Sequence, residues 1–213
     1  MKLYGRATSF NVQKVIWLLE ELELSYEHIE LGGRFGGLDS ADFAHLNPMQ
    51  KVPVLIDEEK IIWESHTILR YLAANYGESA WYFPDPYQRS LYERWMDWAH
   101  LTFQPVFMGT FWGYFRMPEA KRDLPKIMQD LQSCQCCLEQ VERQLEGKAY
   151  LISETISLAD ICVGAILYRL TAQGLDITLP ANVARWFELL KSRPGYQKGI
   201  MSDFSELKGR EDF

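Results

Sequence analysis

Glu64 and Ser65 are adjacent polar residues at the point where a β-rich run gives way to a helical pattern. A serine at such a position caps a helix, and the free backbone amides of the first helical turn attract a carboxylate. A glutamate beside them suits a ligand that also carries an ammonium group. The pair therefore fits an α-amino acid, with Ser65 and the amides holding its carboxylate and Glu64 its amine. An ordinary helix cap beside a surface glutamate is the alternative.

Pro53 lies inside the strand-like run that precedes this junction. Proline has no backbone donor, so sheets accept it only at edges, bulges and special turns. A cis bond between Val52 and Pro53 costs only about 0.5–1 kcal/mol and would turn the preceding backbone outward. Val52 could then offer its N–H and C=O to an extended peptide, as a neighbouring strand would. A trans proline at a sheet edge is the alternative.

The composition is that of a globular chain, and it restricts the partners. The 213 residues are 47% apolar and carry a formal net charge of −7, which argues against a nucleic-acid surface with a basic stripe. Neither a signal-peptide stretch nor a run of about 18 apolar residues is present, so we expect a cytoplasmic protein without a membrane span. The cysteines at 134, 136, 137 and 162 all lie in the second half of the chain, and the first three fall within a helical pattern. We expect reduced thiols on helices rather than a metal site.

The first 77 residues predict the element order β-α-β-α-β-β-α. Apolar residues at 12, 15, 16, 19 and 22 mark one helix face, and the segment SYEHIEL alternates as a strand does. A short helix around residues 40–43 should stop before Pro48, and VPVLID and KIIWES predict a hairpin. Helical spacing resumes at Ser65 and ends near Gly77.

Residues 80–87 are rich in proline and polar residues and are the best candidate for a linker. Beyond them, helix-period apolar residues predict helices over 88–115, 124–147, 157–173 and 181–192. Ser157 and Asp160 should form a capping box at the third of these helices. The expected fold class is α/β plus all-α, with a small α/β domain at 1–79 and an all-helical domain at 88–213.

The segments NPMQKVPVL and WESHTILRYL resemble the glutathione-binding half of cytosolic glutathione transferases, and SLADICVGAIL and RWFELLKSRPGYQKG extend the resemblance over the whole chain. The resemblance implies a thioredoxin-like domain, a helical bundle, glutathione as co-substrate and no metal. It also implies a homodimer whose interface involves the first long helix after the linker and the segment near Arg70. By resemblance Pro53 is cis, Val52 pairs with the cysteinyl backbone of glutathione, and Glu64 and Ser65 hold its γ-glutamyl end. Further contacts are implied for Gln50, Lys51 and His66.

The thiol of glutathione needs activation, because a free thiol with a pKa near 8.5 is only slightly ionised at neutral pH. Related proteins use a Tyr, Ser or Cys between the first strand and the first helix; here the loop RATSFNVQKV has no cysteine, and Tyr4 lies in the strand. Ser9 matches the activating serine, and Asn11 completes a Ser-x-Asn pattern similar to theta-, delta- and nu-like members. A hydrogen bond from either residue to the thiolate would contribute about 1.5–3 kcal/mol. Thr8 is a third candidate, and a purely capping role of Ser9 or Asn11 is the alternative.

An aromatic stripe at i,i+4 spacing follows at Phe103, Phe107, Phe111 and Phe115, beside Met108 and Trp112. Such a stripe usually belongs to a hydrophobic core. Its density nevertheless predicts that part of it faces a small apolar electrophile, the second substrate. The candidates for this pocket are Phe107, Phe111, Trp112 and Phe115.

These features favour a detoxifying glutathione transferase, in which the bound thiolate attacks an electrophilic carbon. A glutathione-dependent reductase of disulfides or peroxides is an alternative, with a second glutathione as the resolving thiol. A zeta-type isomerase is disfavoured, because residues 7–14 lack the Ser-Ser-x-Ser-x-Arg pattern. A non-catalytic interaction module that retains the fold is the remaining alternative. The sequence does not identify the acceptor, since an apolar pocket selects shape rather than chemical identity.

Overall fold

The computed structural model describes residues 1–78 and 81–211. The elements of its first part are β1 (Lys2–Tyr4), α1 (Phe10–Glu21), β2 (Glu27–Ile29), the 3-10 turn η1 (Gly33–Phe35), α2 (Ala41–Leu46), β3 (Val54–Asp57), β4 (Lys60–Trp63) and α3 (Ser65–Tyr76). This order confirms the predicted β-α-β-α-β-β-α succession. The hairpin is confirmed as well, because β3 and β4 pair antiparallel.

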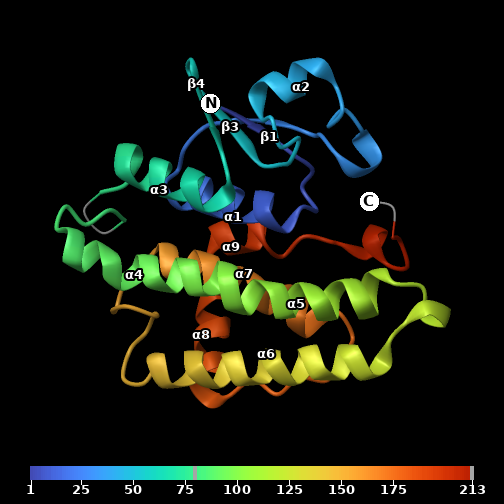
Figure 1. The fold of residues 1–213 in the computed structure, drawn as a ribbon. Coiled ribbons are helices and arrows are strands. Elements are labelled where there is room, and N and C mark those ends of the chain that lie inside the picture. Colours follow the sequence, from blue (N-terminus) through green and yellow to red (C-terminus); the bar gives the residue numbers. More distant parts are fainter. Residues whose placement is uncertain (79–80, 212–213) are drawn as a thin grey trace.

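The four strands form one mixed sheet in the order β2-β1-β3-β4. β1 pairs in parallel with β2 and antiparallel with β3. Leu3 and Leu55 are partners in this register, and both are fully buried in a core that also contains Ile68 and Leu72 of α3. Figure 1 shows α1 and α3 on one side of the sheet and α2 on the other. The arrangement confirms the predicted thioredoxin-like part.

In residues 81–211 the described elements are helical. They are α4 (Pro86–Trp98), η2 (Ala99–Phe103), α5 (Gln104–Thr110), η3 (Phe111–Arg116), η4 (Glu119–Lys121), α6 (Leu124–Gln144), α7 (Leu158–Ala172), α8 (Ala181–Lys191), α9 (Pro194–Gly199) and η5 (Ser205–Leu207). The predicted α/β plus all-α class is confirmed. The short α9 was not predicted, because six residues are too few to show a helical period.

The helix predicted over 88–115 differs from the structure at its start and in its interior. α4 begins at Pro86, within the expected linker, because Asp85 caps it by accepting from the N–H of Tyr87 at 2.7 Å. Proline at the first helical position loses nothing by lacking a donor. Two π-helical stretches, η2 and η3, flank α5, where Pro105 cannot donate to a preceding carbonyl. The predicted domain end at 79 and linker start at 80 lie outside the described residues, so the domain division remains a prediction.

α1 packs against α7 and α9 as well as α3, and it thereby joins the two parts of the chain. Trp17 of α1 is fully buried and meets the ring of Tyr196 edge-on, with the centroids 4.7 Å apart. Gly199 permits this approach, because a Cβ there would lie 2.7 Å from the backbone nitrogen of Trp17. At the start of α7, Ser157 and Asp160 form the predicted capping box.

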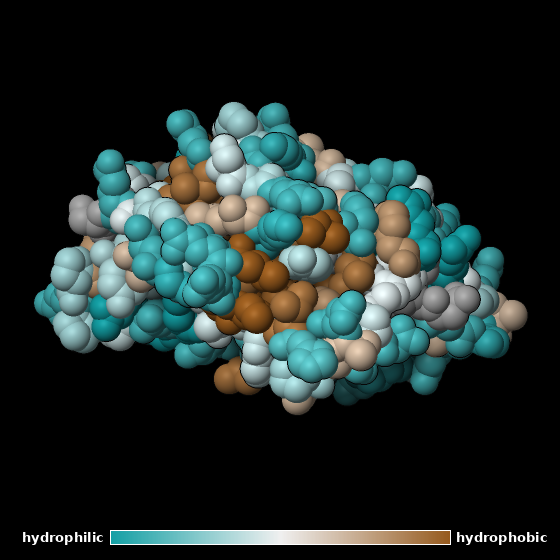
Figure 2. Space-filling model, turned by 90° about the horizontal axis from the view of Figure 1, so that it is seen from above, coloured by the Kyte–Doolittle hydropathy of each residue, from teal (hydrophilic) through white to brown (hydrophobic). Residues whose placement is uncertain are grey.

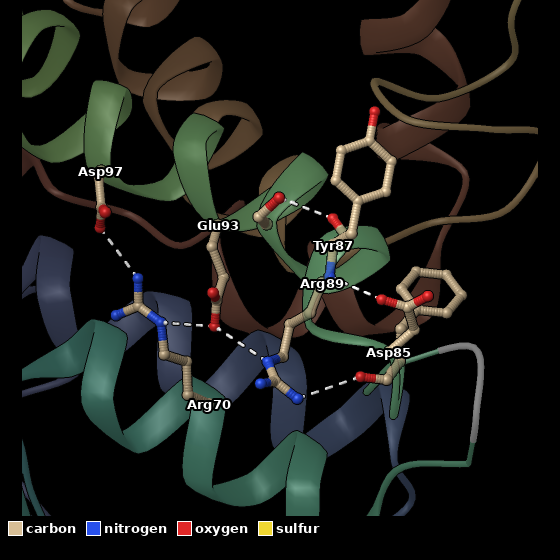
Figure 3. Close-up of polar contacts among 8 residues, drawn as sticks. Arg70, Asp85, Tyr87, Arg89, Glu93 and Asp97 are labelled. Carbon is tan, nitrogen blue, oxygen red and sulfur yellow. Dashed lines mark hydrogen bonds and ion pairs between the residues drawn. The ribbon is translucent and has the colours of Figure 1, made fainter.

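Arg70 links α3 to α4. Figure 3 shows its guanidinium between two carboxylates of α4: Nε lies 3.5 Å from Glu93, and Nη2 donates to Asp97 at 2.9 Å. Arg89, on α4 itself, approaches the same carboxylate of Glu93 at 3.8 Å. The segment predicted to lie near a dimer interface is therefore held by charges within its own chain.

All four cysteines lie on helices, and three of them are buried. Cys134, Cys137 and Cys162 are buried and Cys136 is exposed, and none of them forms a disulfide. Burial raises the pKa of Cys134 and Cys162 to about 12, so both remain protonated at neutral pH. In the described residues, no group of three or more His, Cys, Asp or Glu side chains could hold a metal ion. None of the described helices is long and apolar enough to cross a membrane.

Candidate functional site

A crevice opens where the sheet and α1 meet the helical part of the chain. A cavity of about 280 Å³ is lined by Asn11, Asn47, Lys51, Val52, Pro53, Glu64, Ser65 and His100. Figure 2 looks down on the face that carries the sheet and α2, and it shows apolar residues gathered near the centre within a mostly hydrophilic margin. The cavity brings together five of the predicted ligand-binding residues with Asn11.

The strand edge at Val52 is built as the sequence predicts. The Val52–Pro53 bond is cis, and within the described residues no hydrogen bond uses the backbone N–H or C=O of Val52. Asn47, which is 2% exposed, supports this segment from below. Its Nδ2 donates to the carbonyl of Lys51 at 2.8 Å, and its Oδ1 accepts from the N–H of Met49 at 2.9 Å. No role was predicted for Asn47, although an asparagine before Pro48 is typical of a turn that its side chain stabilises through a donor and an acceptor.

Glu64 and Ser65 lie at the strand-to-helix junction, as predicted, but Glu64 and not Ser65 is the N-cap residue. Glu64 occupies the N-cap position of α3, and Ser65 is the first helical residue. The expectation that Ser65 caps the helix is wrong, because the left-handed backbone of Glu64, with a φ of 67°, ends the extended segment one residue earlier. Such a backbone costs about 1–3 kcal/mol in a residue other than glycine and is concentrated at functional sites. The N–H groups of the first turn of α3 have no side-chain cap here and remain available to an anion.

A chain of buried polar side chains lies beneath this junction. Lys14 is fully buried, and its Nζ donates to Nε2 of His66 at 3.0 Å and to Oε1 of Gln104 at 3.1 Å. Nε2 of Gln104 in turn donates to Oδ1 of Asn11 at 3.4 Å. Burial lowers the pKa of Lys14 to about 8, with the charge of Glu64 acting in the opposite direction. Lys14 therefore remains mostly protonated at neutral pH, with no carboxylate bonded to it among the described residues.

The donor and the acceptor of each hydrogen bond in this series of side chains are fixed by Lys14. An ammonium group can only donate, so the amide of Gln104 must present its oxygen to Lys14 and its nitrogen to Asn11. Asn11 then uses its oxygen within the protein, and its Nδ2 is the group that can donate to a ligand. A role for Asn11 was predicted, whereas Gln104 and His100 were not. Gln104 lies 90 positions from Lys14 in the chain, so no local pattern indicates their contact.

A second, smaller cavity of about 150 Å³ adjoins the start of α1. It is lined by Arg6, Thr8, Ser9, Phe10, Asn11, Met108, Phe111, Trp112, Arg116, Arg169 and Leu207. Ser9 is the N-cap residue of α1, yet its side chain makes no capping hydrogen bond, so its hydroxyl can donate elsewhere. Asn11 lines both cavities, and the two together can therefore hold a ligand in each with Ser9 and Asn11 between them.

The predicted aromatic pocket is only partly assembled in this second cavity. Phe111 and Trp112 line it, whereas Phe107 and Phe115 do not and are 0% and 7% exposed. Phe107 packs against Phe10 with centroids 5.3 Å apart, and Phe115 stacks on Phe111. Of the remaining predicted residues, Gln50 is exposed and lines neither cavity. His66 is bonded to Lys14 and lines a further cavity that shares Glu64, Ser65 and His100 with the first.

The similarity to known proteins extends over most of the chain. Residues 1–74 match the family model described as glutathione S-transferase, N-terminal domain, and residues 103–194 match its C-terminal domain. Glutathione S-transferase GstB of Escherichia coli is 37% identical over 93% of this chain and 97% of its own length. The crystal structure of a theta-class glutathione S-transferase from Xanthomonas axonopodis pv. citri with glutathione bound superposes with a TM-score of 0.90. It shares 37% identity and covers 95% of this chain and 97% of that one.

Proposed function

The chain belongs to the glutathione S-transferase family, and on that premise we propose that it binds glutathione in the 280 Å³ crevice and that the glutathione thiolate attacks and bonds to an electrophilic carbon. The observation that carries this proposal is the arrangement around Asn11. Backbone groups for a peptide, amides for a carboxylate and two side-chain donors for a thiolate all border the two cavities that share Asn11.

Glutathione would lie along the crevice as an added strand. Val52 offers its N–H and C=O to the cysteinyl backbone, and the amides of the first turn of α3 with Ser65 receive the γ-glutamyl carboxylate. Glu64, which is exposed beside them, pairs with the γ-glutamyl amine. Lys51 and the exposed Gln50 complete the binding site as further contacts, in which Lys51 supplies a positive charge to the otherwise anionic tripeptide.

The sulfur would lie between the two cavities, within reach of Ser9 and Asn11. The hydroxyl of Ser9 and Nδ2 of Asn11 donate to the thiolate and so lower the pKa of the thiol. The buried ammonium of Lys14 is linked to Asn11 through the side chain of Gln104, and its positive charge also favours the thiolate. The thiol proton goes to solvent, the sulfur attacks the carbon, and the leaving group departs with the bonding electron pair.

Two further points belong to the proposal. The enzyme works in the cytoplasm, and it does so as a homodimer in which α4 and the segment around Arg70 form part of the contact. The second point is supported by the ion pairs that hold α3 and α4 together as one surface.

The test is an ultraviolet difference titration with glutathione that follows thiolate absorbance in the wild type, in Ser9→Ala and in Asn11→Ala. A saturable signal in the wild type that falls in one variant identifies the principal donor. Ser133→Ala, which removes a hydroxyl from α6 far along the chain, is the matched control and should leave the signal unchanged. Absence of a saturable signal, together with absence of binding by calorimetry, would overturn the enzymatic proposal in favour of a non-catalytic module.

A further inference from the structure

The 150 Å³ cavity next to Ser9 is lined by three arginines as well as by aromatic residues. Arg6 precedes α1, Arg116 ends η3, and Arg169 belongs to α7, so segments far apart in the sequence converge there. Neither aspartate nor glutamate is among the described residues that line the cavity. A pocket for purely apolar acceptors would not compensate these charges, because each buried cation loses hydration at a cost in free energy.

Arg169 is the most informative of the three. Its side chain is 2% exposed, and Nη2 donates to the backbone carbonyl of Thr8 at 2.7 Å. Its Nε is buried and has no hydrogen-bond partner, and none of the ion pairs found among the described residues includes Arg169. The guanidinium lies over the rings of Phe111 and Phe204, 5.3 Å from each centroid. A buried guanidinium held by one carbonyl and two aromatic faces still lacks an anion.

The charges around the cavity act together. Burial lowers the pKa of Arg169 to about 9, and the positive charges of Arg6 and Arg116 lower that pKa further. Arg116 stacks on Trp112 with 3.6 Å between its guanidinium carbon and the ring centroid, and its Nε donates to the carbonyl of Arg210 at 3.0 Å. Burial lowers the pKa of Arg6, while the charges of Glu206 and Glu30 act in the opposite direction. Glu206 is also bonded to Arg34 and to the hydroxyl of Thr8, each at 2.8 Å. Arg169, in contrast, has no carboxylate bonded to it among the described residues, so an anionic ligand in this cavity can pair with it.

We propose that the acceptor substrate of this enzyme is a small organic anion, whose carboxylate or related acidic group binds Arg169 while its electrophilic carbon faces Ser9 and Asn11. The inference rests on the proposed function, since it identifies the class of the second substrate. The cavity volume of about 150 Å³ limits the acceptor to a few heavy atoms beside the rings of Phe111 and Trp112. The arginines also offset the repulsion between an anionic acceptor and the thiolate that attacks it.

The reaction of such an acceptor balances without a further reactant. With an α-halo acid, the thiolate sulfur forms a bond to the α-carbon, the carbon–halogen bond breaks, and the halide leaves with the bonding pair. The carboxylate stays intact and remains bound to the guanidinium throughout. No oxidant or reductant is required.

Iodoacetate and iodoacetamide provide the test, because they undergo the same displacement and differ mainly in charge. Each kcat/KM is divided by the rate of the uncatalysed reaction with glutathione, so that the intrinsic reactivities cancel. We expect the wild type to favour iodoacetate, and we expect Arg169→Met to reduce this preference by about 10- to 100-fold, as the loss of one charge-assisted hydrogen bond predicts. Arg143→Met, which removes a charge from the exposed face of α6, is the matched control and should retain the preference.

Two outcomes would overturn the inference. One is a wild type that does not favour iodoacetate; this measurement needs no variant and remains decisive if Arg169→Met fails to fold. The other is an Arg169→Met protein in which both reagents lose activity equally, because Arg169 would then only hold the Thr8 carbonyl and the loop of Ser9. Arg169→Lys, which keeps the charge, should restore part of the preference. Failure of the proposed function itself looks different, since neither reagent would then react faster than in free solution and the thiolate signal would be absent.

Discussion

The ammonium nitrogen of Lys14 lies 3.0 Å from Nε2 of His66, and both side chains are buried between α1, α3 and α5. Two buried cations cannot share this contact, so the imidazole must be neutral and must present its lone pair to the lysine. Burial, followed by the charge of Lys14, lowers the pKa of His66 to about 2. The lysine thereby fixes the state of a histidine on one side and the orientation of the Gln104 amide on the other.

This contact makes stability depend on pH. The folded pKa of His66, about 2, lies below its ordinary value of 6.5, so between these values the unfolded chain binds a proton that the native state refuses. The stability is therefore complete above pH 6.5 and falls below it, by about 2 kcal/mol between pH 7.5 and pH 5. In His66→Gln, whose amide oxygen can still accept from Lys14, this part of the loss should disappear. Urea denaturation at the two pH values measures it.

The comparison with the wild type removes the effect of other titrating groups. Asp160 is one of them, because burial raises its pKa to about 6, and its stabilisation on acidification runs in the opposite direction. His45→Gln, on the exposed side of α2, serves as control and should keep the pH dependence of the wild type. Equal losses of stability in His66→Gln and in the wild type would contradict the assignment of a neutral, protected His66.

Gln104 should act as a positioning residue for Asn11. Gln104→Met removes the bond that engages Oδ1 of Asn11, so the Asn11 amide is no longer held with Nδ2 as its outward donor. We expect the apparent pKa of bound glutathione to rise by about 0.5–1 unit, a fraction of one charge-assisted hydrogen bond. The pH dependence of the thiolate absorbance measures this pKa, and Gln129→Met on the exposed face of α6 is the control. An unchanged pKa with weaker binding would show that Gln104 shapes the cavity but does not orient Asn11.

Local patterns in the sequence predict the fold and the edge of the site well. The order of strands and helices, the cis proline and the Glu64–Ser65 junction all depend on residues that are neighbours in the chain. The cap was assigned to the wrong residue because a left-handed glutamate has no signature in composition or period. The π-helical stretches beside Pro105 were missed for a related reason, since a change in hydrogen-bond pattern preserves the apolar period.

Local sequence patterns could not predict contacts between residues that are far apart in the sequence. Lys14 lies among apolar residues of α1 and looks like one surface charge until α3 and α5 enclose it. Arg169 lies within the apolar stretch of α7, where a charged residue is expected to reach solvent at the edge of the core. The aromatic stripe was correctly recognised as partly core, but which rings reach the cavity depends on how η3 packs against Phe204.

Arg193 should contribute much more to stability than its neighbour Lys198, although both bind adjacent glutamates of α1. Nε and Nη2 of Arg193 donate to the two oxygens of Glu21 at 2.8 and 2.5 Å, and the Glu21 side chain is only 8% exposed. Arg193→Met leaves that carboxylate buried with Trp17 as its remaining donor, and we expect a loss of about 2–4 kcal/mol. Lys198→Met breaks an exposed pair with Glu20 and should cost less than about 1 kcal/mol. Urea denaturation of the two variants decides this, and equal losses would contradict a role for Arg193 in holding α1 against α9.

Asp160 should be the most sensitive position outside the cavities, because one buried carboxylate serves three segments. It accepts from the N–H of Leu151 at 2.9 Å, from the N–H and hydroxyl of Ser157 at 2.9 and 2.8 Å, and from Nε1 of Trp186 at 3.1 Å. Asp160→Ala leaves these donors unpaired in a fully buried place, and we expect a loss of about 3–5 kcal/mol.

Ser157→Ala removes one side of the capping box and leaves the carboxylate bonded to the other donors, so its expected cost is about 1 kcal/mol. Asp160→Asn, whose amide nitrogen must face a donor, should fall between the two and provides a measurable variant if Asp160→Ala does not fold. Thermal unfolding in the absence of glutathione ranks all three without involving the cavities. A ranking in which Ser157→Ala is as damaging as Asp160→Ala would mean that the cap of α7, and not the link from α7 to Leu151 and Trp186, is what the carboxylate provides.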